Sequence, residues 1–446
     1  MLLQPMNCIS APISGATRRF APARRLPLLI GVFLVIACNG PATETANARD
    51  ANEYDVRYVV TLNPDEGSAD VELRLSQSQP LLREVRFRVR DENRIGGFEG
   101  DGELRREGER VVWSPPGHGG SLSWRATIDH RRNSSGYDAK LDQDWGIFRA
   151  EDIVPRASTR AQGGATANTT LEFELPANWS IVTEYDGEDG KFAVPNDGRR
   201  FKQPTGWIAT GRLGVRKEQI AGVEVAIAGP VEQGVRRLDL LALLNWTLPE
   251  LARVVPDMPP RITIIGAGDP MWRGGLSAPA SLYMHASRPL ISENGTSTLL
   301  HEILHIALRL KSDRGYDWIV EGLAEYYGLE LLRRSGTITT NRYELAMASL
   351  LDWSGDAESL CDRSSKGPVT ALAVRIFAAL DKEIRRKSAG THDLDDVVYE
   401  IVERDRRVNT AELRDVVNGL LGENPDTLHI DNLPGCRNIG AAESQS

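Results

Sequence analysis

The chain has 446 residues, which is too long for one ordinary hydrophobic core and enough for two or three domains. It is 41% hydrophobic and 26% charged, which is typical of a soluble globular protein. The formal net charge is -9, and it becomes -13 without residues 1–38, which hold four arginines and no acidic residue. Such a surface repels phosphate backbones, so we do not expect nucleic acid as a partner.

The first 38 residues are predicted to be an export signal. Four arginines between positions 18 and 25 precede an apolar run at 26–37 that is too short to span a bilayer. The run ends in Val-Ile-Ala-Cys, which resembles the lipobox of bacterial lipoproteins, so Cys38 is predicted to carry a lipid anchor in the membrane. A plain secretory signal cleaved near Ala37 is the alternative. Because Asn39 follows Cys38, we expect the periplasmic face of the outer membrane rather than the inner membrane.

A β-rich region follows a polar tether. From Tyr54 to about Gly229, apolar and polar residues mostly alternate, as in the runs 71–75 and 171–175. Clusters of Gly, Pro, Asn and Asp separate the runs, which favours a sheet-rich domain of the sandwich type.

From about Val235 the apolar spacing becomes helical. Two strand-like runs, at 261–265 and 281–285, lie between the first two predicted helices. The predicted helices cover residues 238–254, 297–310, 318–334, 342–351, 367–387, 394–403 and 411–421. The sequence therefore predicts a multidomain α+β protein: a β domain, a small mixed core and a helical C-terminal part.

The motif that carries chemistry is His301-Glu302-Ile303-Leu304-His305, inside one predicted helix. Two histidines at i and i+4 lie about 40° apart around a helix and about 6 Å apart along it, so both can reach one zinc ion. Glu302 lies about 100° around from His301 and points beside the metal. There it could move a proton between water and a leaving amine.

The next predicted helix supplies further ligands. Glu321 and Glu325 lie one turn apart on an otherwise apolar helix, where an unpaired carboxylate is costly. Two histidines leave zinc under-coordinated, so we assign Glu321 as the third protein ligand, with one position left for water. Glu325 is expected to accept the far N–H of a zinc-bound histidine. In the alternative, both glutamates face solvent and the histidines belong to an ordinary helix.

These motifs together resemble the gluzincin metallopeptidases. The pairing of His301-Glu302-x-x-His305 with Glu321-Gly-x-x-x-Tyr326 is most similar to the glycyl aminopeptidase family and more distantly to the aminopeptidase N family. The resemblance implies that His301, His305 and Glu321 are zinc ligands, that Glu302 is the general base, and that the substrate is a peptide or protein. The 15 residues between His305 and Glu321 are fewer than the family usually has.

The resemblance also implies the domain layout of that family. Applied to this chain, it predicts an N-terminal β-sandwich-like domain (51–230), a thermolysin-like zinc catalytic domain (231–340) and a C-terminal helical domain (341–425). The residues themselves predict a lipoprotein signal peptide (1–38) and a tether (39–50) before these domains, and a tail (426–446) follows them.

One altered family motif is the edge strand that binds substrate. It aligns with Gly274, Gly275 and Ser277, and Ser277 stands where the family has a Glu that binds the substrate's amino group. A neutral hydroxyl cannot pair with an ammonium group as a carboxylate does. We therefore do not expect strict aminopeptidase specificity, although the strand could still pair with a peptide backbone.

The other altered motif supplies the family's oxyanion-stabilising Tyr. Ser364 stands in that position and is too short for the same reach. Loss of one oxyanion donor typically costs about two to three orders of magnitude in rate. Tyr283 and Tyr326 are candidates to replace it, as are Tyr316 and Tyr327.

The motifs allow three functions. The first is an active zinc peptidase, which the complete ligand set and Glu302 favour. The second is a non-catalytic zinc-binding envelope lipoprotein that acts as a binding or assembly scaffold, which the altered motifs favour. In the third, the motif is a coincidence in a structural envelope protein.

Two cysteines remain beyond the export signal. In an oxidising compartment Cys361 and Cys436 could pair and attach the tail to the helical region. Two separate buried thiols are the alternative.

Overall fold

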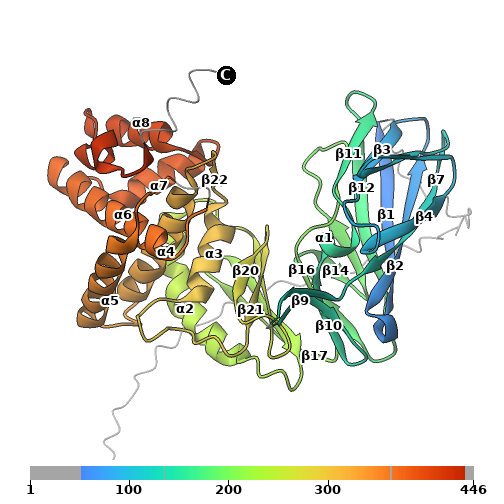
Figure 1. Ribbon diagram of the computed structural model, residues 1–446, viewed down its shortest axis with the longest axis horizontal. Helices are drawn as coiled ribbons and strands as arrows, with labels where there is room; N and C mark the ends of the chain where they lie inside the picture. Colours follow the sequence, from blue (N-terminus) through green and yellow to red (C-terminus); the bar gives the residue numbers. More distant parts are fainter. Residues whose placement is uncertain (1–51, 135, 362–363, 437–446) are drawn as a thin grey trace, which may run out of the picture. The chain divides into compact units, whose positions relative to one another are not determined.

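The first half of the described chain consists of β-strands, in line with its alternating sequence. The computed structural model describes residues 52–134, 136–361 and 364–436 (Figure 1). The predicted signal peptide, Cys38 and the tether lie outside these residues, so their predictions remain untested.

Three sheets make up this half of the chain. The seven-stranded sheet contains, in order, β14 (Asp186–Glu188), β15 (Lys191–Val194), β12 (Thr166–Glu174), β1 (Glu53–Asn63), β2 (Ser68–Gln77), β7 (Gly119–Thr127) and β4 (Ile95–Gly100). The four-stranded sheet contains β11 (Ala157–Ala161), β3 (Leu82–Arg88), β6 (Arg110–Ser114) and β5 (Glu103–Glu107). The five-stranded sheet contains β13 (Ser180–Val182), β16 (Trp207–Gly211), β10 (Trp145–Arg149), β9 (Gly136–Leu141) and β8 (His130–Asn133). A short helix, α1 (Ala150–Ile153), follows β10.

A mixed five-stranded sheet forms the base of the second half. Its order is β17 (Leu213–Ile220), β18 (Val223–Pro230), β19 (Arg261–Ala267), β21 (Ser281–His285) and β20 (Gly275–Ser277). β18, β19 and β21 run parallel, whereas β20 pairs antiparallel with β21 and forms the edge. One edge of this sheet thus ends in the short strand that the glycine-rich motif occupies.

Seven helices pack with this sheet or follow it among the described residues of the second half, and the first of them, α2, lies between β18 and β19. They are α2 (Arg237–Val254), α3 (Thr298–Leu308), α4 (Asp317–Arg334), α5 (Thr340–Trp353), α6 (Pro368–Lys387), α7 (Leu394–Glu403) and α8 (Thr410–Leu421). Every helix predicted in this region is confirmed to within two residues at each end. α3 ends early because Arg309 adopts a left-handed conformation, with φ of 49°. The sequence did not predict the parallel pair of β22 (Lys311–Ser312) and β23 (Arg407–Val408).

The α+β class is thus confirmed, and the apolar core has separate parts. One cluster fills the β-rich half, and a second joins the mixed sheet to the helices. A third packs Trp145 and Trp207 of the β-rich half against Ile265 and Tyr283 of the mixed sheet. Among the described residues, no helix has the length and apolar character needed to cross a bilayer.

A disulfide joins Cys361 to Cys436 across 75 positions. Its loop encloses α6, α7 and α8 and attaches the end of the described chain to the segment before α6. Of the two alternatives left open by the sequence, the structure has the paired one.

Candidate metal centre

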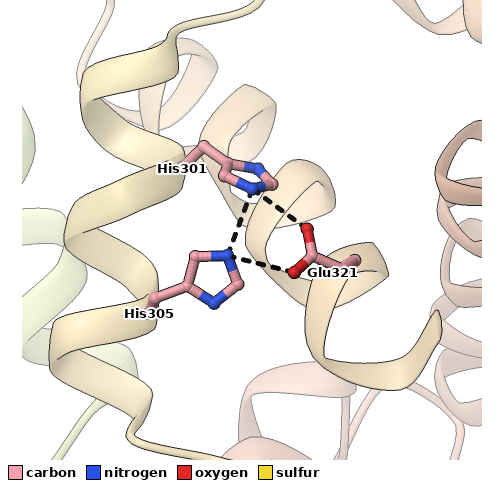
Figure 2. Close-up of side chains that lie close together, drawn as sticks. All are labelled: His301, His305 and Glu321. Carbon is pink, nitrogen blue, oxygen red and sulfur yellow. Dashed lines mark hydrogen bonds and ion pairs between the residues drawn. The ribbon is translucent and has the colours of Figure 1, made fainter. Parts of the chain in front are cut away.

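Helix α3 presents both histidines of the motif. The side chain of Ser297 caps the helix and accepts a hydrogen bond from the backbone N–H of Leu300. The helix buries its apolar residues, while His301 and His305 keep 19% and 17% of their side chains exposed. Their Nε2 atoms lie 3.1 Å apart, so both imidazoles point to one place (Figure 2).

Helix α4 brings Glu321 to the same place. Its Oε2 lies 3.2 Å from Nε2 of His301, and its Oε1 lies 3.5 Å from Nε2 of His305 (Figure 2). The three donor atoms all lie within 4.8 Å of one another. Zinc bonds of about 2.0–2.2 Å in a tetrahedron place neighbouring ligand atoms about 3.4 Å apart. The three side chains therefore fit one zinc ion.

Glu325, one turn further along α4, contacts the other nitrogen of His301. Its Oε2 lies 3.0 Å from Nδ1. An ionised Glu325 can only accept, so Nδ1 carries the proton and Nε2 of a neutral His301 presents a lone pair. That lone pair faces the carboxylate of Glu321 and Nε2 of His305. Such a set of electron donors is stable only around a proton or a metal ion.

The charges of the metal-free site agree with this. Burial lowers the pKa of His301, but hydrogen bonds with Glu321 and Glu325 outweigh it and raise the pKa to about 10. Burial raises the pKa of Glu321, but hydrogen bonds with His301 and His305 outweigh it and lower the pKa to about 2. The site therefore attracts positive charge strongly.

Glu302 lies beside this group and contacts the edge strand. Its Oε2 accepts a hydrogen bond of 2.8 Å from the backbone N–H of Ser277. Glu302 is only 9% exposed. A Cβ atom on Gly275 would lie 3.2 Å from Oε1 of Glu302 and 2.7 Å from Cγ2 of Thr298. The absence of a side chain at Gly275 thus allows β20 to approach α3 this closely (Figure 1).

The free edge of β20 faces the same region. On the other edge, the carbonyl of Gly274 accepts a hydrogen bond from the N–H of His285, and the N–H of Ala278 donates to the carbonyl of Ser281. Both partners, His285 and Ser281, belong to β21. Because antiparallel pairing alternates, the N–H and C=O groups of Gly275 and Ser277 point away from β21. The Ser277 N–H is the one that meets Glu302.

The tyrosines suggested as oxyanion donors have other surroundings. The hydroxyl of Tyr283 donates to the backbone carbonyl of Trp272, and its ring packs against Trp207. Tyr326 is 4% exposed and lies about 140° around α4 from Glu321. The oxyanion role for which these two tyrosines are candidates stays a prediction.

Ser364 is exposed in the segment between the disulfide and α6. Its neighbour Ser365 donates its backbone N–H to Asp317 at the start of α4.

Sequence reasoning missed two residues of the β-rich half that hold the edge strand. Trp207 donates its Nε1–H to the carbonyl of Leu276 (2.9 Å) and its backbone N–H to Oγ of Ser281 (2.8 Å). Glu184 accepts from Oγ of Ser281 (2.6 Å) and from the N–H of Ala280 (3.2 Å). No local pattern marks either residue, since their partners lie far along the chain.

Comparison with known proteins supports the fold. No family model and no curated protein matches this sequence. Among solved structures, the chain is similar to the crystal structure of an aminopeptidase N family protein from Idiomarina loihiensis. The TM-score is 0.60 at 16% sequence identity, over 87% of this chain and 75% of the other. At this identity the likeness shows a shared fold.

Proposed function

We propose that this protein is a zinc-dependent peptidase. The observation that carries the proposal is the convergence of His301, His305 and Glu321 next to Glu302, at the free edge of β20. A metal site, a carboxylate outside the ligand set and an unpaired strand edge are parts with which a metal-dependent enzyme can bind and hydrolyse a peptide. The aminopeptidase-like fold of the structural neighbour supports the same reaction class.

In this proposal His301, His305 and Glu321 hold the zinc ion. Bound zinc supplies a Lewis acid that polarises a peptide carbonyl. Glu325 fixes the proton of His301 on Nδ1 and so keeps Nε2 available as a ligand.

Glu302 acts as the general base and then as the general acid. It takes a proton from the attacking water and delivers it to the nitrogen of the leaving amine. The N–H of Ser277 holds one oxygen of the carboxylate, which leaves the other oxygen to receive the proton.

The substrate backbone pairs with β20. Gly275 offers its outward N–H and C=O and Ser277 its outward C=O, and an extended peptide can add to these groups as a further strand. Since Ser277 carries no charge, nothing in this strand favours a substrate's free amino end. We therefore propose that the enzyme cleaves bonds inside peptides, or that it removes residues from peptides whose N-terminal end is unusual for an aminopeptidase substrate.

The alternative is a zinc-binding scaffold without catalysis. It is favoured by the two altered motifs, in which Ser277 and Ser364 stand where the resembled family has Glu and Tyr, and by the hydroxyl of Tyr283, which donates to the carbonyl of Trp272. The two functions differ in hydrolysis and not in zinc content.

We further propose that the mature protein is anchored by a lipid on Cys38 at the periplasmic face of the outer membrane. The paired cysteines Cys361 and Cys436 support an oxidising compartment.

The test combines zinc analysis with cleavage of a mixed peptide library by three proteins. These are the parent, Glu302→Gln, and the control Glu293→Gln, which alters an exposed carboxylate just before α3. We expect about one zinc ion per chain in all three, and a loss of at least about two orders of magnitude in rate only for Glu302→Gln.

One zinc ion per chain with no hydrolysis by any of the three would favour the scaffold. The absence of zinc from the parent would contradict both proposals.

A further inference from the structure

A cation of the β-rich half lies beside the start of the edge strand. The guanidinium carbon of Arg132, on β8, lies 3.9 Å from the ring centroid of Trp272. Arg132 is exposed, and among the described residues no carboxylate lies within ion-pair distance of it. Stacking on an indole holds a guanidinium in place while its N–H donors remain available.

The hairpin that carries Arg132 is fixed to the loop before β20. Tyr137, on β9, donates its N–H to the carbonyl of Pro270 (3.0 Å) and accepts from the N–H of Trp272 (2.7 Å). These two hydrogen bonds on either side of Tyr137 extend the pairing of β9 onto this loop. The position of Arg132 is therefore set by backbone pairing as well as by stacking.

The ring of Trp272 lies over Gly274, the residue before Gly275, and Gly275 is the residue that approaches Glu302. A Cβ atom on Gly274 would lie 2.1 Å from the indole ring of Trp272, so the ring lies directly on the strand. One residue further, Gly275 approaches Glu302. Neighbouring residues of a strand face opposite sides of the sheet and are about 3.3 Å apart. The ring of Trp272, with the guanidinium stacked on it, therefore lies on the face of the strand opposite α3 and Glu302.

The direction of pairing decides which end of the substrate meets Arg132. A peptide that adds antiparallel to β20 runs from Ser277 towards Gly274. Its residue opposite Gly274 lies after the bond that Glu302 faces, and the side chain points to the same face as Trp272. The part of the peptide on the C-terminal side of the cut thus approaches the guanidinium.

We propose that Arg132, held on Trp272, binds a carboxylate of the substrate two or three residues after the cleaved bond. This inference rests on the peptidase function proposed above and adds a preference to it. The carboxylate can belong to an Asp or Glu side chain or to the C-terminus of a short peptide, since both accept the paired N–H donors of a guanidinium.

The positive charge of this subsite is opposite in sign to the net charge of the molecule. The chain without residues 1–38 carries -13, which repels acidic peptides at long range. An uncompensated Arg beside the strand supplies the local attraction that an acidic substrate needs, and Ser277 adds no competing negative charge.

The test measures both binding and cleavage of matched peptides. One series has an amidated C-terminus and carries Asp or Asn at each of the first four positions after the cut. A second series compares free with amidated C-termini on short peptides. Each series is measured with the parent, Arg132→Gln and Arg131→Gln. Arg131 is the matched control, because it precedes Arg132 on β8 and stacks instead on Tyr137, 4.7 Å away.

We expect the parent to bind the Asp peptide about tenfold more tightly than the Asn peptide at the second or third position, and Arg132→Gln to lose this ratio. The ratio should persist in Arg131→Gln. The series in which the preference appears identifies the source of the carboxylate.

Equal losses in both variants would assign the effect to general charge and overturn the subsite. A parent that binds Asp and Asn peptides equally would overturn it too. Since the ratio is measured from binding, it tests the subsite even if no peptide is hydrolysed, and that failure would count against the peptidase function instead.

Discussion

Glu325 determines how one ligand of the proposed zinc site is oriented. Its carboxylate lies 3.0 Å from Nδ1 of His301, on the side of the ring away from Glu321. Carboxylates in this position fix the tautomer and raise the basicity of a metal-binding imidazole. Metal affinity should therefore depend on a residue that does not touch the metal.

We predict that Glu325→Gln binds zinc about 10- to 100-fold more weakly than the parent. An amide can offer Nδ1–H an uncharged acceptor only. The affinity is measured by competition with a chelator of known strength. Glu293→Gln should bind zinc as the parent does, and equal affinities in all three proteins would show that Glu325 has no influence on the metal.

At the residue scale the sequence predicted much of the site. His301, Glu302 and His305 lie on one helix, as Glu321 and Glu325 do, so fixed helical spacing determined which side chains share a face. The contact of Glu302 with Ser277 could not be predicted, because it depends on how closely β20 approaches α3.

The element that links the two halves of the chain to the site is β20. α3 holds it from one side through Glu302, and the β-rich half holds it from the other through Trp207. A strand of three residues has few hydrogen bonds of its own, so its position depends on these outside contacts.

We predict that Trp207→Phe raises KM for peptides several-fold with a smaller effect on kcat. The change removes the Nε1–H donor to Leu276 and leaves a partly buried carbonyl with one partner fewer. Steady-state kinetics separates the two constants. Trp113→Phe is the control, because Trp113 is also fully buried and donates Nε1–H to a carbonyl, that of Asp101, away from the site. A similar effect of both changes would assign it to general destabilisation.

We also predict that Gly275→Ala lowers kcat at least tenfold while the protein stays folded. The new Cβ would lie 2.7 Å from Cγ2 of Thr298 and 3.2 Å from Glu302, so either the strand or the base must move. Gly328→Ala, where no atom lies within 4 Å of the added Cβ, should keep its rate and gain about 1 kcal/mol of stability from helix propensity. Unchanged kinetics in Gly275→Ala would show that this close approach is unimportant.

At the element scale the sequence predicted the helices well and the supports of β20 poorly. Helices follow from spacing within about four residues. Trp207 contacts Leu276 across 69 positions and Glu184 contacts Ser281 across 97, and no periodic pattern encodes such pairs.

The last segment that the structure describes is attached to the helical region at several points. Glu383, on α6, accepts hydrogen bonds from the backbone N–H groups of Asp426 and Thr427. It also forms an ion pair with Lys387. Burial raises the pKa of Glu383, but the bonds from Thr427, Lys387 and Asp426 outweigh it and lower the pKa to about 2.

This shift predicts a pH dependence of stability. Since the pKa is about 2 in the folded chain against an ordinary 4.5, ionised Glu383 stabilises the fold fully above about pH 4.5 and loses this effect as pH falls towards 2. Glu383→Gln should thus unfold at lower urea concentration than the parent at pH 7, with a difference that shrinks between pH 4.5 and 2. Glu400→Gln, at an exposed ion pair, should match the parent throughout. A pH-independent difference for Glu383→Gln would refute the assignment.

The disulfide has a consequence for when the protein becomes fully assembled. Glu321 reaches the site on α4, and α4 packs on α6 through Trp318 and Phe377. α6 lies within the loop that Cys361 and Cys436 close. In a reducing cytoplasm this bond does not persist, so a newly made chain would hold these helices by packing alone. If the protein is exported as proposed, oxidation would then act as a final, covalent maturation step, and the proposed peptidase site would reach its most constrained form only after it has left the proteins among which it is synthesised.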